Sequence, residues 1–364
     1  MENEIINFIN VWLTVCASLC YCYLIGKNVR PGGRRLISIF PVVCLFLYLP
    51  LRLSSAHLGG PTAFFIAWLA NFKLLLFSFA GGPLSSDPPL PLRRFLAVSC
   101  LPIKIQRNHL QISQNGENTS PKSSPNAPQI ETPLPSKSFL SYAIKGFLVA
   151  LMVKLYDYSE FMHPKLVMCI YSWHIYFLLE IILAAAKFLA RNLLGAELEP
   201  QFNDPYFSTS LQDFWGRRWN LMVTGILNPT VYKPTIRLAA PVVGRKWAPL
   251  LAVLATFFVS AMMHELIFYY LGRMRPDWEV SRFFAVHGVA LTVEILAKKA
   301  WPEKCRRVPA VVSVPLTVGF VFVTGIWMFF PQFVRCGIDV KAFAEYAAVS
   351  DFFTKRLFLI GELI

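Results

Sequence analysis

The chain has 364 residues, of which 55% are hydrophobic, 15% aromatic and only 15% charged, and its formal net charge is +14. Soluble globular proteins carry about 25% charged residues, so this composition excludes an ordinary soluble domain and indicates a membrane protein. The positive charge alone would suit a nucleic-acid partner. The basic residues lie between apolar segments, however, which points to membrane topology instead.

Repeated apolar runs of about twenty residues predict helices that cross the roughly 30 Å hydrocarbon core of a bilayer. We therefore expect an all-α, polytopic membrane protein with about eight transmembrane helices, within a range of seven to nine, in a single domain over residues 1–364. In chain order the predicted spans are 5–25, 36–51, 62–80, 139–155, 166–190, 249–271, 282–297 and 309–330, and a weakly apolar segment follows Phe343.

Lysine and arginine are concentrated in alternate connections between these spans. Of these residues, 22 lie in the connections 27–35, 81–137, 191–248 and 298–308, and five lie in the other connections. The positive-inside rule places the basic connections in the cytosol and the N-terminus in the lumen. Residues 106–137 are polar and rich in Pro, Ser and Asn, which predicts a disordered cytosolic loop.

The connection 191–248 differs from the others because it is dense in aromatic and charged residues, including the stretch QFNDPYFSTSLQDFWGRRWNLMV. Ser210 followed by Asp213 matches a helix-start pattern. Asp213 and Arg217 stand four residues apart, in the order that favours an ion pair on a helix. The pattern predicts an amphipathic helix on the cytosolic membrane surface, a substrate site, or both. Apolar and aromatic side chains recur there at helical spacing: Trp215, Trp219 and Met222.

The predicted span 249–271 contains the stretch FVSAMMHELIFYY, in which His264 and Glu265 are adjacent in an apolar helix. Ionisable residues are costly at membrane depth and usually mark function there. Because residues four apart share a helix face, Thr256 and Ser260 form a polar stripe with His264. Glu265 points about 100° away from that stripe. We expect the stripe to face protein or a cavity, where it serves either interhelical hydrogen bonding or chemistry.

Other ionisable residues lie in the predicted spans, and we expect most of them to serve structural pairing. His287 and Glu294 are seven residues apart and therefore share a helix face. Glu180 belongs to a mixed polar and aromatic stripe on the fifth span. For Lys73 and Lys145 we likewise expect structural pairing, with the alternative that the charged end reaches the membrane surface while the apolar stem stays in the helix bundle.

A neutral imidazole in a dry cavity can take a proton from a hydroxyl group at physiological pH. The sequence has no G-x-S-x-G motif for a serine nucleophile, and no phosphate-binding or dinucleotide-binding glycine motif. Its eight cysteines form no C-x-x-C pair, and its six histidines lack metal-ligand spacing, so we expect neither a metal nor a bound cofactor. The residues permit direct acyl transfer between two bound substrates, with His264 as the base.

Three segments resemble the plant wax synthases, which are long-chain-alcohol O-fatty-acyltransferases. They are LPLRLSSAHLGGPTAFFIAWLANFKLLLFSF (49–79), SLQDFWGRRWNLMV (210–223) and VSAMMHELIFYYL (259–271). The similarity covers nearly the whole chain outside 106–137, and acyl-CoA:sterol acyltransferases share the same motifs. The wax synthases are in turn similar to the membrane-bound O-acyltransferases that make triacylglycerol and steryl esters.

The resemblance implies a tunnel enclosed by helices, in which an acyl group passes from acyl-CoA to a long-chain fatty alcohol and gives a wax ester. The wider family carries a loop motif with Asp-Trp-Trp or a near variant, an Asn, and a downstream His in an apolar span. In 191–248, Asp213-Phe214-Trp215 matches the loop motif and Asn220 the Asn, and His264 matches the His. By this likeness His264 is the general base, and Asn220 holds the histidine or the developing oxyanion.

The same resemblance implies substrates and location. Acyl-CoA is a co-substrate from the cytosol, the alcohol comes from the lipid membrane, and the protein lies in the endoplasmic reticulum membrane, with no nucleic-acid partner. Two alternatives stay open: an acyl-CoA:sterol O-acyltransferase, and a non-catalytic lipid-binding or transport protein. The residues expected to contact acyl-CoA are Asp213, Trp215, Arg217, Arg218 and Trp219.

Overall fold

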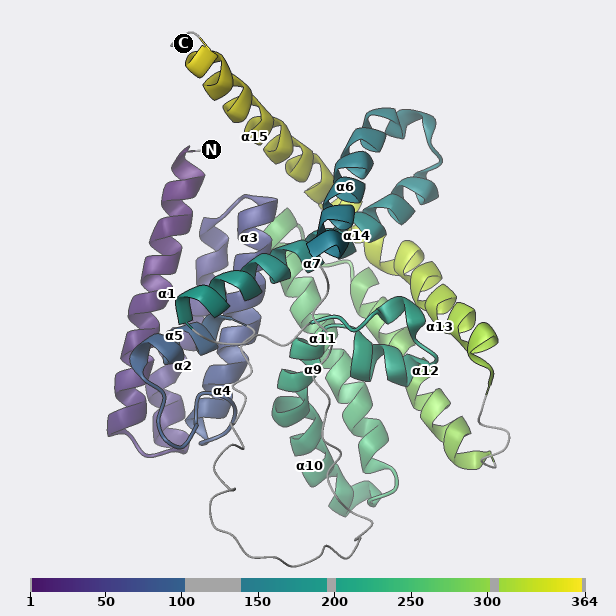
Figure 1. Ribbon diagram of the computed structural model, residues 1–364. Helices are drawn as coiled ribbons and strands as arrows, with labels where there is room; N and C mark the ends of the chain where they lie inside the picture. Colours follow the sequence, from purple (N-terminus) through teal and green to yellow (C-terminus); the bar gives the residue numbers. More distant parts are fainter. Residues whose placement is uncertain (1, 102–138, 195–200, 302–307, 362–364) are drawn as a thin grey trace, which may run out of the picture.

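The computed structural model of the protein describes residues 2–101, 139–194, 201–301 and 308–361 (Figure 1). Over this part of the chain the regular secondary structure is helical, without a strand. The predicted all-α class is therefore confirmed. The segment 106–137, for which the sequence predicts a disordered loop, lies outside the described residues.

Seven helical segments in the described part of the chain are long and apolar enough to cross a membrane. The number lies within the predicted range, and the polytopic membrane fold is confirmed. The remaining predicted span forms the 17-residue helix α6 (Phe139–Leu155), and the weakly apolar C-terminal segment forms α15 (Ile338–Gly361). The seven segments are Asn3–Asn28, Gly33–Arg52, Ala56–Ser78, Pro164–Phe188, Ala248–Gly272, Glu279–Ala300 and Ala310–Arg335.

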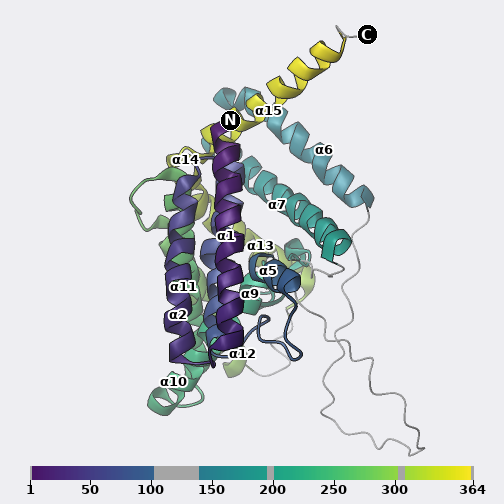
Figure 2. The same ribbon diagram turned by 90° about the vertical axis from the view of Figure 1, so that its left-hand side faces the viewer.

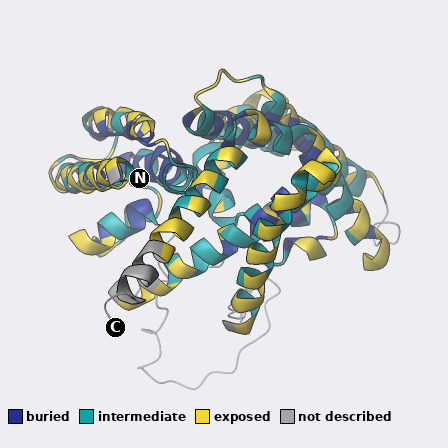
Figure 3. Ribbon diagram, turned by 90° about the horizontal axis from the view of Figure 1, so that it is seen from above, coloured by how far each residue is buried: buried dark blue, intermediate teal, exposed yellow. Residues whose placement is uncertain are grey.

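The outer surfaces of these helices carry exposed apolar side chains, and the buried residues gather where helices face one another (Figure 3). Leu13 in α1 (Glu2–Asn28) is 62% exposed, and Leu316 in α13 (Ala310–Thr324) is 67% exposed. Large apolar surfaces are costly in water, whereas hydrocarbon chains cover them without that cost. The exposed belt therefore matches a lipid-facing surface.

The N-terminal helices form one packed group. Helices α1 and α2 (Gly33–Tyr48) stand side by side (Figure 2), and α5 (Leu92–Cys100) packs against α1. Contacts within the group are made by apolar side chains from each helix, so burial of these residues fixes how the helices pack. The most deeply buried of them include Val15, Leu19, Ile39, Phe46 and Phe95.

A broken membrane helix belongs to the same group. It runs as α3 (Ala56–Ala63), a π-helical turn (Phe64–Ala70) and α4 (Asn71–Ser78). A π-turn widens the helix by one residue per turn and so redirects the side chains it carries, and such turns are frequent at functional sites. Trp68 lies in this turn and is only 2% exposed.

The central group is built on α11 (Ala248–Gly272) and α12 (Glu279–Ala300), two successive helices that pack along each other. Gly288 permits their close approach, because a Cβ atom at this position would lie 3.1 Å from the Cβ of Phe257. The pair therefore forms a tight frame around the predicted histidine, which lies in the middle of α11.

Two further elements cover the central pair. The short amphipathic helix α10 (Lys233–Val243) packs along α11. Helix α13 continues through a π-turn (Gly325–Phe329) into α14 (Phe330–Arg335), and this turn contacts α12. The turns between α1 and α2 and between α10 and α11 lie at the end of the molecule opposite the N-terminus (Figure 1), which agrees with placing both basic turns on one side of the membrane.

Hydrogen bonds from Tyr270 and Arg273 fasten the N-terminal group to α11. The hydroxyl of Tyr270 donates to the carbonyl oxygen of Leu47 at 2.6 Å, and the guanidinium of Arg273 donates to that of Leu53 at 2.9 Å. Ala63 and Ala67 pack against the Tyr270 side chain. These contacts hold the broken helix beside α11.

Helices α6 and α7 (Pro164–Leu194) pack together as a hairpin (Figure 1). Lys145 of α6 forms an ion pair with Glu180 of α7, which is the structural pairing expected of that glutamate. Lys73 in α4 is 3% exposed and donates to the carbonyl oxygens of Val98 and Leu101 at the end of α5. Both lysines therefore find buried acceptors within the helix bundle, which is the structural pairing expected of them.

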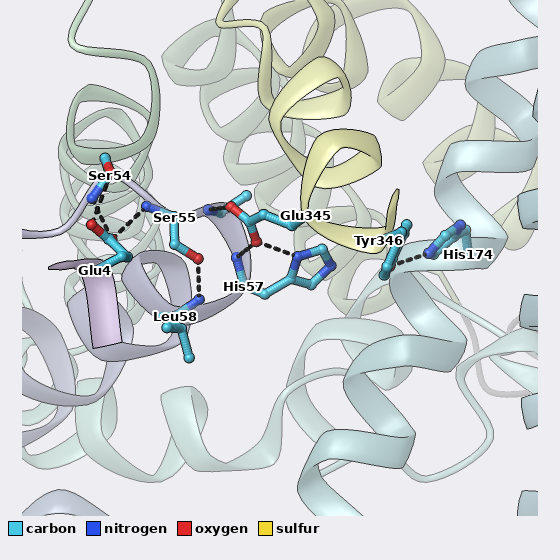
Figure 4. Close-up of polar contacts among 9 residues, drawn as sticks. Glu4, Ser54, Ser55, His57, Leu58, His174, Glu345 and Tyr346 are labelled. Atoms are coloured by element: carbon cyan, nitrogen blue, oxygen red, sulfur yellow. Dashed lines mark hydrogen bonds and ion pairs between the residues drawn. The ribbon is translucent and has the colours of Figure 1, made fainter. Parts of the chain in front are cut away.

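The C-terminal helix α15 starts against the bundle and then extends away from it (Figure 1). Figure 4 shows its main attachment, in which Glu345 accepts hydrogen bonds from the backbone N–H of Ala56 at 2.6 Å and from Nδ1 of His57, also at 2.6 Å. The hydroxyl of Tyr346 is hydrogen-bonded to Nε2 of His174 at 3.0 Å. Helix α15 therefore joins the start of α3 to α7.

We expect Glu345→Gln to destabilise the protein by about 2 kcal/mol, because it weakens charge-assisted hydrogen bonds. Burial by itself raises the pKa of the Glu345 carboxyl. Hydrogen bonds from His57 and Ala56 together outweigh burial, so the pKa lies below its ordinary value of 4.5. The carboxylate therefore stabilises the fold above that pH, and its contribution is lost as the pH falls through the lowered pKa. Thermal unfolding in detergent from pH 7 to pH 3 should show a shallower acid loss for Glu345→Gln than for wild type. The exposed Glu160→Gln should match wild type, and equal acid profiles for all three proteins would refute this role.

Candidate active site

A cavity of about 480 Å³ lies among α7, α11, α12, α13 and the segment that follows α7. Its wall is mainly aromatic and apolar, so it suits a substrate with a long hydrocarbon body. The aromatic residues that line it include Trp68, Trp173, Tyr176, Phe214, Trp215, Trp219, Phe257, Phe283, Phe284 and Phe329.

His264 lies on the wall of this cavity, in the middle of α11. Its Nδ1 atom is 2.7 Å from the carbonyl oxygen of Ser260. A carbonyl can only accept, so Nδ1 carries the proton and Nε2 is the unprotonated nitrogen of a neutral ring. The ring is held by Phe284 at a centroid distance of 4.4 Å and by Trp68 at 5.2 Å. The helix therefore supplies an oriented imidazole with a free lone pair.

The other two members of the predicted polar stripe, Thr256 and Ser260, also line the cavity. The hydroxyl of Thr256 donates to the carbonyl of Ala252 at 2.7 Å, so its oxygen is the part that remains to accept a hydrogen bond. Glu265 points elsewhere, as its position on the helix predicts: it accepts hydrogen bonds from the backbone and hydroxyl of Ser281 at the start of α12. The stripe and the glutamate therefore serve different parts of the molecule.

His287 of α12 is a fully buried histidine near the cavity, but both of its ring nitrogens are engaged. The indole Nε1–H of Trp215 lies 3.1 Å from Nδ1, and the hydroxyl of Thr324 lies 2.8 Å from Nε2. A histidine in this position has no free nitrogen for a substrate. The geometry therefore distinguishes His264 from His287 as the candidate base.

The predicted helix start at Ser210 is present. Its hydroxyl accepts a hydrogen bond from the backbone N–H of Asp213 at 3.1 Å and begins the short helix α8 (Leu211–Asp213). Glu294 of α12 accepts from the backbone N–H of Leu211 at 2.7 Å and pairs with Lys298. The structural pairing expected of Glu294 thus anchors residues 210–223, which we call the motif segment, to the central helices.

The prediction of an amphipathic helix beyond this start is wrong, because the helix breaks after one π-turn (Phe214–Arg218). The backbone N–H of Trp219 bonds to the carbonyl of Phe214 at 2.8 Å, which is the five-residue spacing of a π-turn. Five-residue spacing places Arg218, instead of Arg217, opposite Asp213, and the ion pair measures 2.8 Å.

Asn220 follows the break with a left-handed backbone, φ 43°, and caps helix α9 (Leu221–Leu227). Asparagine tolerates this conformation better than most residues, and its side-chain oxygen faces the backbone N–H of Val223 at 3.4 Å. Its side-chain NH₂ has no hydrogen-bond partner among the described residues. Since Asn220 lines the cavity, that NH₂ group is available to a substrate oxygen.

The five residues expected to contact acyl-CoA divide into two sets. Trp215 and Trp219 line the cavity, whereas Asp213, Arg217 and Arg218 do not. Arg218 is committed to Asp213 and to two backbone carbonyls. Arg217 is exposed. Of these two arginines, Arg217 is therefore the one that remains available to bind a phosphate of acyl-CoA.

Trp68 and Phe329 contact the His264 ring but were not among the predicted site residues. Trp68 belongs to the quoted stretch 49–79, to which the sequence assigned no chemical role. The sequence signal for Trp68 was that the whole stretch resembles the wax synthases; no motif within the stretch predicted a contact with the histidine.

In the part of the chain that the structure describes, no group of three or more His, Cys, Asp or Glu side chains could hold a metal ion.

The fold and the site together define a polytopic membrane protein with a mainly aromatic and apolar cavity beside one oriented histidine. The profile of the "Membrane bound O-acyl transferase family" matches residues 198–286, which include the motif segment and His264. The chain belongs to the plant wax synthase family of membrane-bound O-acyltransferases, and it is therefore an acyltransferase of the membrane.

Three relatives cover almost the whole chain. Acyl-CoA--sterol O-acyltransferase 1 of Arabidopsis thaliana is 51% identical over 95% of this chain and 96% of its own length. The long-chain-alcohol O-fatty-acyltransferase of Simmondsia chinensis is 43% identical, with 98% of each chain covered. Probable long-chain-alcohol O-fatty-acyltransferase 3 of Arabidopsis thaliana is 43% identical over the full length of both chains. The predicted family and the enzyme class are confirmed.

Proposed function

We propose that the protein transfers a fatty acyl group from acyl-CoA to the hydroxyl of a long-chain fatty alcohol, giving a wax ester, with His264 as the general base. The observation that carries this proposal is the hydrogen bond from Nδ1 of His264 to the carbonyl of Ser260, which leaves Nε2 unprotonated on the wall of an apolar cavity. A base oriented by a second group is the usual arrangement for activating a hydroxyl.

The reaction balances with this one base. Nε2 of His264 takes the hydroxyl proton while the alcohol oxygen attacks the thioester carbonyl carbon, and the carbonyl oxygen becomes an oxyanion. The NH₂ group of Asn220 supports that oxyanion by donating a hydrogen bond. When the intermediate collapses, the carbon–sulfur bond breaks and the thiolate of CoA leaves. The imidazolium returns its proton to the thiolate, so the neutral histidine is regenerated.

A second acceptor, a sterol, is favoured by one specific observation, the 51% identity to a protein named as an acyl-CoA sterol O-acyltransferase. Both acceptors present a hydroxyl on a large apolar body, and the aromatic lining suits either of them. We place the reaction in the endoplasmic reticulum membrane, because the basic connections facing the cytosol would meet acyl-CoA there.

The test is an assay of membranes from a host that lacks its own neutral-lipid synthesis. Labelled acyl-CoA is supplied with fatty alcohol, sterol or diacylglycerol, and the labelled ester is separated and counted. Wax ester as the main product supports the proposal, and steryl ester as the main product supports the second candidate. A well-expressed protein that forms no ester with any acceptor would point to a lipid-binding or transport role instead.

The two neighbouring arginines give a matched pair for the acyl-CoA site. We expect Arg217→Ala to raise the KM for acyl-CoA about fivefold without changing thermal stability, because an exposed guanidinium is positioned for a phosphate. Arg218→Ala should lower the free energy of unfolding by about 2 kcal/mol, because it removes an ion pair and two carbonyl contacts. Kinetics and thermal unfolding of both variants in one detergent distinguish these effects. An unchanged KM in Arg217→Ala would remove that residue from the acyl-CoA site.

A further inference from the structure

Trp215, His287 and Thr324 form a hydrogen-bonded chain that runs from the motif segment through α12 to the end of α13. His287 is 0% exposed, so the middle of the chain is closed to solvent, whereas Trp215 and Thr324 are partly buried. Its three members come from three elements that wall the cavity. No part of the proposed chemistry uses this chain directly.

The direction of each hydrogen bond follows from the chemistry of the groups. An indole N–H can only donate, so Nδ1 of His287 accepts and carries a lone pair. The proton of the neutral ring is therefore on Nε2 and is donated to the hydroxyl oxygen of Thr324, 2.8 Å away. The Thr324 hydroxyl in turn donates to the carbonyl of Phe320 at 2.7 Å. A backbone carbonyl at one end thus fixes a single tautomer of His287 that can accept from Trp215.

Trp215 is braced on two sides by these contacts. Its carbonyl oxygen accepts a hydrogen bond from the hydroxyl of Thr224 in α9 at 3.1 Å. Its ring meets Phe257 of α11 edge to face, at a centroid distance of 5.5 Å. It therefore ties the short segment that carries Asn220 to the helix that carries His264.

We propose that His287 is a positioning residue: by accepting the Trp215 indole N–H in the tautomer set by Thr324, it fixes the motif segment and so keeps Asn220 on the wall of the cavity that His264 also lines. This inference rests on the proposed function. It assigns His287 no contact with substrate, so its loss should lower kcat with little change in the KM for either substrate.

Two near-isosteric replacements separate this role from simple packing. Asparagine places an amide oxygen near the position of Nδ1, where it can accept from Trp215. Glutamine places its amide near the position of Nε2, where it can reach only Thr324. If His287 acts through Trp215, His287→Asn should keep kcat within about threefold of wild type, and His287→Gln should lower it about tenfold, the loss expected for one hydrogen bond. If His287 only fills space, the larger glutamine should perform at least as well as asparagine.

A double-mutant cycle with Trp215→Phe tests the partner. This variant keeps an aromatic ring and removes the N–H donor, so alone it should lower kcat about as much as His287→Gln. In the Trp215→Phe protein, His287→Gln should cause no further loss. Losses that multiply would show that the two residues act independently and would overturn the proposal.

An activity-independent measurement separates failure of this inference from failure of the proposed function. The chain has nine tryptophans, so ¹⁵N-indole labelling in detergent gives few signals, and the signal missing from Trp215→Phe identifies Trp215. That indole proton should shift upfield in His287→Gln and in Thr324→Val, and should stay near its wild-type position in His287→Asn and Thr324→Ser. If the chemical shift of the Trp215 indole proton is unchanged by all four substitutions, the hydrogen bond from Trp215 to His287 is excluded, whether or not the protein forms ester.

Discussion

Replacing His264 with alanine is expected to lower ester formation by about 10²–10⁴-fold, while the protein remains in the membrane at its normal abundance. The variant removes the only unengaged imidazole nitrogen that the described residues present to the cavity. His264→Gln should be equally inactive, because an amide fills the same space but cannot take a proton. The measurement is labelled ester formed per unit of immunodetected protein.

The matched control is His163→Ala, since His163 is exposed and lies outside the cavity. It should retain wild-type activity. If His264→Gln kept more than a tenth of the wild-type rate, His264 would be a packing residue and the base would have to be sought elsewhere.

Asn220→Asp is expected to lower kcat by about 10²-fold with little loss of stability. Aspartate tolerates the left-handed backbone and caps α9 as well as asparagine does, but it lacks the NH₂ donor. Loss of one oxyanion donor costs about 10²–10³ in kcat. Steady-state kinetics with saturating acyl-CoA, together with thermal unfolding, measure the two effects separately.

Asn220→Gly completes this test. Glycine adopts the left-handed conformation without strain and costs only a few tenths of a kcal/mol as a helix cap. It should therefore fold normally and be as inactive as Asn220→Asp. High activity in either variant would reduce Asn220 to a capping residue, with no part in the reaction.

The sequence predicted the membrane helices well because each is a long apolar run whose length matches the bilayer. It also placed Thr256, Ser260 and His264 on one helix face, since only helical periodicity is needed for that inference. The pattern of charges on the connections predicts which of them face the cytosol, because that inference depends on composition and not on packing, and this orientation stays a prediction.

The π-turns explain most of what the sequence could not predict. A pattern read with 3.6 residues per turn pairs Asp213 with Arg217, whereas the π-turn Phe214–Arg218 pairs it with Arg218. The insertion of one residue into a turn leaves no mark in the hydrophobic pattern. The same limit applies to Trp68, which lies in a π-turn of its own helix and contacts the ring of His264.

The attachment of α15 has a consequence for biosynthesis. The first N–H groups of α3 are capped by Glu345, which follows them by nearly 290 residues and is synthesised after the seven membrane-spanning segments described above. The helix that continues from α3 carries Trp68, one wall of the cavity. During co-translational insertion, this wall therefore gains its final support only after Glu345 itself has left the ribosome, later than the seven membrane-spanning segments of the described residues. Catalytic competence should accordingly appear only once α15 has been made and has docked, so that shorter nascent chains in the membrane have an unfinished site.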